Sequence, residues 1–257
     1  MRRVVLVVAA AAMLAASVAD ADVFGGANVR ATFKGRLEPR SLPRSEPAPV
    51  ALHLKGRLWT TDGKPPPQLR RLTIAINRFG NVSTRGLRAC RRGAIDARTS
   101  AAALAACRDS VVGSGRFSAH IAIPSQAPFP ARGRMLAFFS RQKGRRVILA
   151  HIFGREPVPT SNVLTLRFQR SAPGAFDTTM SLLLPNVGED WGHVTGFELN
   201  LHRRYTYRGK KHSLITASCP APKGFGSAVF AAAKGTYHLA DGRVISRVVT
   251  GRCRVSR

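Results

Sequence analysis

Alternation of apolar and polar residues is the feature that most restricts the fold of this chain. In the segments 72–77 and 197–202, large apolar residues occupy every second position. A period of two residues is that of a β-strand with one buried face. Further strands are predicted at 50–60, 82–89, 115–123, 135–141, 146–153, 163–169, 178–184, 213–218, 235–240 and 244–251. The chain is therefore expected to consist mostly of short strands.

Turn signals and a single helical segment complete this prediction. Asp62-Gly63, Gly80-Asn81 and Asp241-Gly242 are dipeptides that tight turns favour, and the third joins two strands as a hairpin turn would. One short helix is expected near 99–108, with Thr99 or Ser100 as its N-cap. The predicted fold is all-β, a β-sandwich or a jelly-roll-like pair of antiparallel sheets.

The start of the chain is typical of an export signal. Arg2 and Arg3 precede an unbroken apolar run, Val4 to Ala16, and Ala19-Asp20-Ala21 offers the small residues that a signal peptidase reads. We expect a Sec-type signal peptide over 1–21, cleaved after Ala21. The alternative is an uncleaved membrane anchor, but the run of 13 residues is shorter than the roughly 20 that a bilayer core requires. No transmembrane segment is predicted for the mature chain.

The rest of the chain is predicted to form one unit after an N-terminal arm. Residues 22–49 are expected to be irregular, because Pro39, Pro43, Pro47 and Pro49 lie close together there. Residues 50–257 form the sandwich unit. A similar order of strand, turn, cysteine and Ala-rich segment recurs around Cys90 and Cys219, so the unit is either a duplication divided near 171–174 or an ordinary series of hairpins.

The four cysteines indicate two disulfides. An even number of cysteines in an exported chain is typical of disulfide bonding. We predict the pairs Cys90–Cys107 and Cys219–Cys253, because these close the shortest loops. A zinc site is disfavoured, since no two cysteines have C-x-x-C spacing and no histidine lies within a few residues of one. We therefore predict neither a metal nor a cofactor.

The charge of the chain is strongly positive. Lys and Arg number 41 against 13 Asp and Glu, a formal charge of +28. A basic surface attracts polyanions such as nucleic acid or anionic cell-wall polymers. The competing interpretation is codon bias, because arginine dominates and the charges are scattered in doublets such as Arg203-Arg204 and Lys210-Lys211. With few aromatic residues, specific nucleic-acid recognition is not expected.

Catalytic motifs are not evident, and one loop is the main alternative site. The sequence contains no G-x-S-x-G elbow, no H-E-x-x-H and no phosphate-binding glycine motif. The loop 186–193 gathers Glu189, Asp190, Trp191 and His193. These residues could bind a sugar or calcium, or they could form an interstrand loop with a buried tryptophan. The candidate binding residues are Glu189, Asp190, Trp191, His193, Arg203, Arg204, Lys210 and Lys211.

Three stretches resemble a group of known proteins. Residues 72–78 (LTIAINR), 147–154 (VILAHIFG) and 219–225 (CPAPKGF) are similar to uncharacterised secreted β-rich proteins of high-GC actinobacteria. The resemblance covers most of the mature chain. It implies an exported β-rich product, and no activity, cofactor or site can be transferred from it.

These observations lead to one functional expectation and one alternative. We expect a secreted, disulfide-stabilised, non-catalytic binding or structural module, extracellular or associated with the cell envelope, with weak affinity for an anionic cell-wall polymer or another polyanion. The alternative is an extracellular carbohydrate-active hydrolase or a calcium-dependent sugar-binding domain. The sequence leaves the oligomeric state open.

Overall fold

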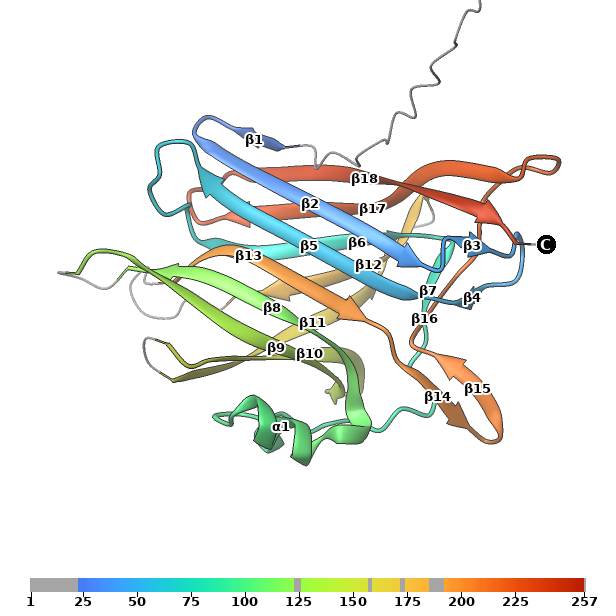
Figure 1. The fold of residues 1–257 in the computed structure, drawn as a ribbon, viewed down its shortest axis with the longest axis horizontal. Coiled ribbons are helices and arrows are strands. Elements are labelled where there is room, and N and C mark those ends of the chain that lie inside the picture. Colours follow the sequence, from blue (N-terminus) through green and yellow to red (C-terminus); the bar gives the residue numbers. More distant parts are fainter. Residues whose placement is uncertain (1–22, 123–125, 157–158, 172–173, 185–191, 257) are drawn as a thin grey trace, which may run out of the picture.

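One large, almost entirely antiparallel sheet of thirteen strands dominates the computed structural model, which describes residues 23–122, 126–156, 159–171, 174–184 and 192–256 (Figure 1). In sheet order the strands are β1 (Phe24–Gly26), β2 (Val29–Glu38), β5 (Ala51–Thr60), β13 (Gly192–Leu201), β8 (Val111–Ile121), β9 (Phe129–Gln142), β10 (Arg145–Gly154), β11 (Thr160–Arg170), β12 (Phe176–Leu183), β6 (Leu69–Asn77), β17 (Ser227–Leu239), β18 (Val244–Val255) and β3 (Ser41–Leu42).

Smaller elements attach to this sheet. A three-stranded sheet contains β4 (Ala48–Pro49), β16 (Ile215–Ala217) and β7 (Gly80–Val82), and a separate hairpin contains β14 (Arg204–Tyr207) and β15 (Lys210–Ser213). The helical elements are η1 (Arg92–Ala94), α1 (Ser100–Ala106) and η2 (Arg108–Ser110). The Thr99 side chain accepts a hydrogen bond from the backbone N–H of Ala102 at 3.2 Å, so of the two predicted candidates Thr99 is the N-cap and Ser100 begins the helix.

The large sheet curls until its two ends lie next to each other. β18, near one end of the strand order, contacts both β1 and β2 at the other end. Figure 1 shows β17 and β18 lying alongside β2 and β5. Phe33, Leu58, Ile74 and Tyr237 are buried inside the curl, where the apolar members of the alternating strands face one another. The predicted all-β, sandwich-like fold is confirmed, with a single curled sheet supplying both walls.

The two disulfides form the predicted pairs. Cys90 is bonded to Cys107, and Cys219 is bonded to Cys253. The first bond anchors α1 over the outer side of β9 and β10, where a second apolar cluster includes Ile95. The helix thus covers strands that are buried on both faces, which explains the continuous apolar run of 147–150.

The N-terminal arm differs from the prediction. Residues 22–49 were expected to be irregular, but β2 runs through ten of them and pairs with β5 along its whole length. Val29, Ala31 and Phe33 face the core, and the prolines begin only after this strand at Pro39. The segment 82–89 also differs, because only Gly80–Val82 is a strand there. Burial of one face therefore outweighs the proline-rich composition that follows it.

The two halves of the chain contribute to the same sheet. β13, from the second half, lies between β5 and β8 of the first half, and β6 lies between β12 and β17. The predicted boundary near 171–174 falls in the connection between β11 and β12, which pair as neighbours. Residues on both sides of that boundary therefore belong to one structural unit, and duplication stays a prediction.

The two ends of the sheet meet along a seam between the edges of β2 and β18. On the edge away from β5, β2 is covered by β1 only at 29–31. On the edge away from β17, β18 pairs with β3 only at Arg254 and Val255. In the described sheet the two edges are otherwise close together without being hydrogen-bonded neighbours.

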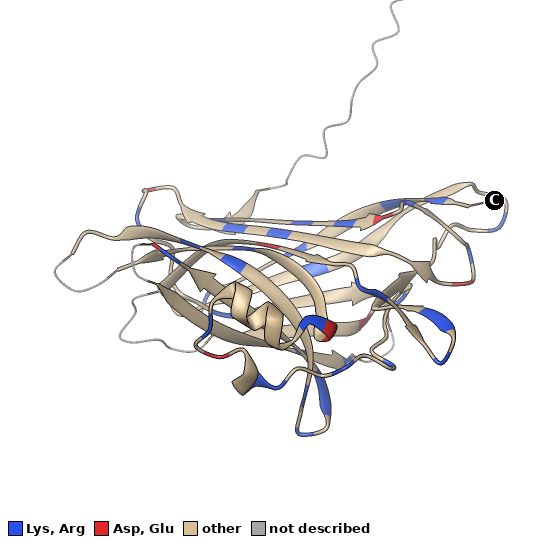
Figure 2. Cartoon of the chain, turned by 60° about the horizontal axis from the view of Figure 1, so that its bottom comes forward, with Lys and Arg blue, Asp and Glu red and all other residues tan. Residues whose placement is uncertain are grey.

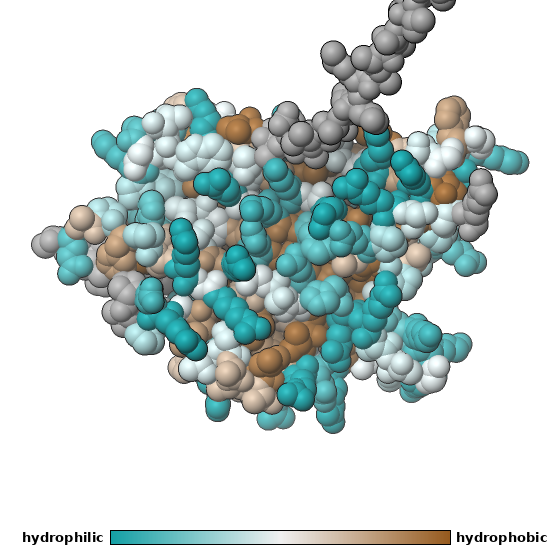
Figure 3. Space-filling model, in the orientation of Figure 1, coloured by the Kyte–Doolittle hydropathy of each residue, from teal (hydrophilic) through white to brown (hydrophobic). Residues whose placement is uncertain are grey.

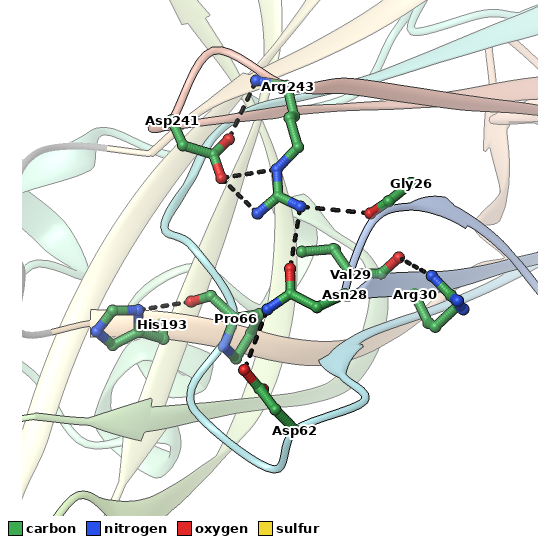
Figure 4. A network of polar contacts seen from close by, with 9 residues as sticks. All are labelled: Gly26, Asn28, Val29, Arg30, Asp62, Pro66, His193, Asp241 and Arg243. Atoms are coloured by element: carbon green, nitrogen blue, oxygen red, sulfur yellow. Dashed lines mark hydrogen bonds and ion pairs between the residues drawn. The ribbon is translucent and has the colours of Figure 1, made fainter.

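Polar side chains close one end of this seam (Figure 4). Arg243, in the β17–β18 turn, forms an ion pair with Asp241 at 2.6 Å. It also donates to the carbonyl of Gly26 and to the side-chain oxygen of Asn28, each at 3.3 Å. Asn28 donates in turn to Asp62 at 3.2 Å. We call these five residues the latch, because they join three loops that are distant in sequence.

Aromatic side chains continue the closure from the latch toward the middle of the seam. The Tyr237 hydroxyl donates to the backbone carbonyl of Thr32 at 3.0 Å, across the seam from β17 to β2. A Cβ atom placed on Gly235 would lie 2.7 Å from the ring of Phe33. The phenyl ring therefore rests directly on the glycine backbone, and no larger residue fits there without displacement.

Candidate functional site

The residues predicted as binding candidates are not together in the structure. Glu189, Asp190 and Trp191 lie outside the described residues. His193 is at the start of β13, whereas Arg203 follows the end of that strand. Eight residues of extended strand between His193 and Leu201 span about 26 Å. The loop and the basic doublets therefore cannot form one site through their described members.

His193 belongs to the latched end of the molecule. Its Nδ1 atom lies 2.7 Å from the carbonyl oxygen of Pro66, in the loop between β5 and β6 (Figure 4). It pairs across the sheet with His120. The hydrogen bond fixes the ring against a backbone carbonyl, so the described contacts give His193 a role in holding the loop.

The other four candidates lie on or beside the β14–β15 hairpin. Over 202–213 the chain contains five Lys or Arg, two histidines, two tyrosines and no acidic residue. Arg208 and Gly209, between the strands, both have positive φ, of 51° and 72°. This is the geometry of a two-residue hairpin turn, and glycine makes one of the two positions favourable. The hairpin therefore presents closely spaced cations on a short ribbon.

Aromatic residues fix the hairpin to the neighbouring loop. The Tyr205 ring stacks on His212 with a centroid distance of 5.6 Å, and its hydroxyl donates to the carbonyl of Arg85 at 2.7 Å. Burial raises the pKa of Tyr205. Tyr207 lies over Gly86, where a Cβ atom would come within 2.3 Å of its ring. These contacts use the aromatic faces for packing, which positions the hairpin relative to the body.

Arg203 has a structural position at the base of the hairpin. Its backbone carbonyl accepts from the N–H of Leu214, and its Nη2 donates to the carbonyl of Asp109 at 3.4 Å. Its Nε atom is buried without a hydrogen-bond partner. The guanidinium of Arg203 is thus directed into the junction between the hairpin and η2.

The remaining cations of the hairpin face solvent. Arg204, Arg208, Lys210 and Lys211 are all exposed. From the strand register, Arg204 and Lys211 share one face, and Lys210 shares the other with the two tyrosines. Arg208 lies over the Tyr207 ring at 5.3 Å, a cation–π contact. Arg88 lies in the loop at 85–88, which contacts the hairpin. Its side chain is 81% exposed and forms an ion pair with Asp109 at 3.0 Å.

Basic residues are present on other surfaces as well, as Figure 2 shows. A row across the outer face of five adjacent strands contains Lys34, Lys55, Glu198, Arg116 and Arg134 in register. Lys55 donates a hydrogen bond to Glu198, which lowers the pKa of that carboxyl. This row is therefore partly neutralised, whereas no described acidic side chain lies within the hairpin sequence.

Sequence reasoning missed part of this site. It named Arg204, Lys210 and Lys211, but Arg208 and the adjoining arginines at 85 and 88 are added by the structure. The turn position of Arg208 was readable from the Arg-Gly pair between two strand-like segments. The approach of the loop at 85–88 was not, because that contact joins residues more than 100 positions apart.

Neither a metal-binding cluster nor a similarity to a known protein adds an assignment. Among the described residues, no group of three or more His, Cys, Asp or Glu side chains is placed to hold a metal ion. Within the same part of the chain, no helix has the length and apolar character needed to cross a membrane. No protein-family model, no curated protein and no solved structure matches the chain.

Proposed function

We propose that this protein is a non-catalytic binding protein that attaches to polyanions through the β14–β15 hairpin. The observation that carries this proposal is the set of four exposed cations, Arg204, Arg208, Lys210 and Lys211, on one short ribbon without an acidic neighbour in its sequence. Such a ribbon can lie along a chain of phosphates or carboxylates and release the counterions bound there.

Rigid attachment of the hairpin favours this use. Tyr205 and Tyr207 hold it against the loop at 85–86, so its cations keep their spacing before a ligand binds. A preorganised site loses less conformational entropy on binding than a mobile one. Cations that contact phosphates carry no sequence information by themselves, so we propose binding to the charged backbone of a polymer.

We place this activity outside the cytoplasm. Two disulfides fit an oxidising environment, and residues 1–21 are predicted to be a signal peptide cleaved after Ala21. The resemblance to secreted actinobacterial proteins supports the same location. An anionic polymer of the cell envelope is then the proposed partner.

The salt dependence of binding tests this proposal. Duplex DNA without a defined sequence and a poly(glycerol phosphate) serve as probes, with affinity measured between 50 and 300 mM salt. For DNA, each lost phosphate contact reduces the slope of log affinity against log salt by about 0.9. The triple variant Arg204→Gln/Lys210→Gln/Lys211→Gln should therefore lower the magnitude of that slope by about 2 to 3.

The matched control removes three exposed lysines elsewhere. Lys64→Gln/Lys223→Gln/Lys234→Gln changes the net charge equally, and these residues lie away from the hairpin sequence. We expect it to leave the slope nearly unchanged. Equal effects of the two triple variants would show that binding follows total charge, and they would contradict the hairpin as the site.

A further inference from the structure

Two adjacent rows of side chains cross the outer face of the large sheet. The first row, described above, contains Lys34, Lys55, Glu198, Arg116 and Arg134 in register. Two residues along each strand, the second row aligns Arg57 on β5, Gly196 on β13, Ser118 on β8 and Arg132 on β9. Residues two positions apart on a strand point to the same face of a sheet. β2, β5, β13 and β8 lie in front in Figure 1, so Figure 3 shows this outer face, with hydrophilic side chains separated by less polar surface.

The first row contains its own anion. The carboxylate of Glu198 accepts a hydrogen bond from Lys55 on the neighbouring strand. This hydrogen bond, together with a smaller effect of the charge on Arg116, lowers the pKa of Glu198. The first row therefore shows how cations on this face of the sheet surround a negatively charged group.

The second row has the outer cations but no carboxylate between them. Gly196 and Ser118 occupy its two middle positions, with Arg57 on one side and Arg132 on the other. In the described part of the chain, no acidic side chain forms an ion pair with either arginine. Three interstrand spacings place their Cα atoms about 14 Å apart. The two arginines therefore border a gap in which a negatively charged group is missing from the row.

A pocket of about 310 Å³ lies at this gap, and both arginines line it. Thr195, which is the extra residue at a bulge in β13, lines it as well. Bulges often re-aim side chains beside functional sites. A Cβ atom on Gly196 would lie 2.9 Å from Ser118 Oγ, so a larger residue at position 196 would crowd that hydroxyl. The irregular strand and the glycine together leave this part of the outer face hollow.

The polar groups of the pocket are arranged as donors. Thr195 Oγ1 donates to Ser118 Oγ at 3.1 Å, and the hydroxyl hydrogen of Ser118 has no acceptor among the described residues. Ser118 can therefore donate to a ligand. Lys64 and His120 also line the pocket, and the described lining residues include no Asp or Glu. Guanidinium, ammonium and hydroxyl donors together suit an anion that only accepts hydrogen bonds.

We propose that this pocket binds a small phosphate monoester, with its phosphate group between Arg57 and Arg132. The phosphate takes the place in the second row that the Glu198 carboxylate has in the first. A phosphate group presents oxygens in several directions, so guanidinium groups on opposite sides can both donate to it. Trp59 and Pro130 line the same pocket and provide apolar surface for the organic part of the ester. The volume is at the lower end of the range for ligand pockets, which suits a small molecule. The proposal is independent of polyanion binding by the hairpin.

Trp59 provides a local readout of binding. The chain contains two tryptophans, so Trp191→Phe leaves Trp59 as the single indole. This protein is titrated with phenyl phosphate, inorganic phosphate, benzoate and phenol at constant ionic strength, and calorimetry gives the stoichiometry. We expect one phenyl phosphate per chain, bound roughly threefold or more tightly than inorganic phosphate because the ring covers apolar surface. Benzoate should bind about tenfold more weakly than phenyl phosphate, and phenol should not saturate the site.

A pair of double variants locates the site. Arg57→Gln/Arg132→Gln should weaken phenyl phosphate binding by about tenfold or more, because each arginine donates charge-assisted hydrogen bonds to the phosphate. The matched control is Lys34→Gln/Arg134→Gln, which removes the same charge from exposed positions in the first row on the same face. We expect the control to bind phenyl phosphate nearly as the wild type does. Thermal melts establish that both variants are folded.

A substitution at Ser118 tests whether the missing group is an anion. Ser118→Glu supplies a carboxylate to the second row and should weaken phenyl phosphate binding by about 100-fold, because the arginines then have an internal partner. Ser118→Gln has nearly the same size without the charge, and it should weaken binding by roughly tenfold or less. Equal losses in the two variants would show that only space matters at this position, and they would contradict the proposal.

Further results would overturn the proposal. These are phenol binding as tightly as phenyl phosphate, inorganic phosphate binding as tightly as the ester, and equal effects of the two double variants. The triple variant of the hairpin should bind phenyl phosphate like the wild type, and Arg57→Gln/Arg132→Gln should keep the salt slope of DNA binding. Loss of one activity with retention of the other would therefore identify which of the two proposals fails.

Discussion

The two ends of the seam between β2 and β18 are built differently. At one end, Arg243, Asn28 and Asp62 join three loops through polar contacts, and Tyr237 bonds across to Thr32. At the other end the walls separate around a cavity of about 820 Å³ whose apolar side chains keep partial exposure. The closed half is fully packed, whereas the apolar side chains of the open half remain partly exposed.

This difference explains how a sheet with two unpaired edges can hold its shape. Unpaired edges attract other strands unless they are covered or charged. Here one half of the seam is covered by packing and polar contacts, and the other carries arginine and lysine side chains. The contacts that close the seam are therefore concentrated at the end where the latch lies.

The largest expected effect comes from truncating side chains on β2 at each end. Phe33→Ala removes a buried ring from the closed half and should cost about 3–5 kcal/mol of unfolding free energy. Leu37 lies four residues further along β2. Leu37→Ala should cost about 1 kcal/mol of unfolding free energy, because the Leu37 side chain is already partly exposed in the cavity. Urea unfolding measures both. Similar losses for the two variants would contradict the difference in packing.

A medium effect is expected at Tyr237. Tyr237→Phe leaves the buried carbonyl of Thr32 without its hydroxyl donor and should cost about 1–3 kcal/mol. Tyr205→Phe, which removes a hydroxyl bonded to Arg85 at the surface, should cost less. Denaturant midpoints at pH 7 compare the stabilities of the two variants. A larger loss of stability for Tyr205→Phe would contradict the role of Tyr237 in closing the seam.

The same tyrosine predicts an alkaline pH dependence. Burial raises the pKa of Tyr237 well above its usual value of about 10. The folded protein favours the neutral hydroxyl, so this contribution to stability is fully present below pH 10 and is lost as the pH rises above it. Tyr237→Phe should therefore show a shallower loss of stability between pH 9 and 11, measured by chemical denaturation.

The smallest effect is expected at the latch. The hydrogen bond from Arg243 lowers the pKa of Asp241, so its stabilising contribution is present above the unfolded value of about 3.9 and is lost as the pH falls through the lower, folded value. Because both side chains are about one-third exposed, the contribution should be below about 1 kcal/mol. Thermal melts between pH 7 and 3 measure this contribution. The melting temperature should fall less with decreasing pH for Asp241→Asn than for Asp96→Asn, which is an exposed control.

Much of the local structure was predictable from short stretches of sequence. The pairing of Cys90 with Cys107, the Thr99 cap and the Asp241-Gly242 turn all depend on residues close together in the chain. The strand β2 was not predicted, since the prolines after it suggested an irregular segment. Of the candidate site, Lys210 and Lys211 were identified as a doublet, but their attachment to the loop at 85–88 was not.

The amino-acid sequence by itself determined the all-β class, the two disulfides and the excess of positive charge, because alternation, cysteine spacing and composition act locally or as sums. Only the tertiary structure decided that β13 inserts between β5 and β8, that β2 meets β18, and that one end of this meeting is open. Those features depend on which distant strands become neighbours, and that choice is made by the packing of the whole core.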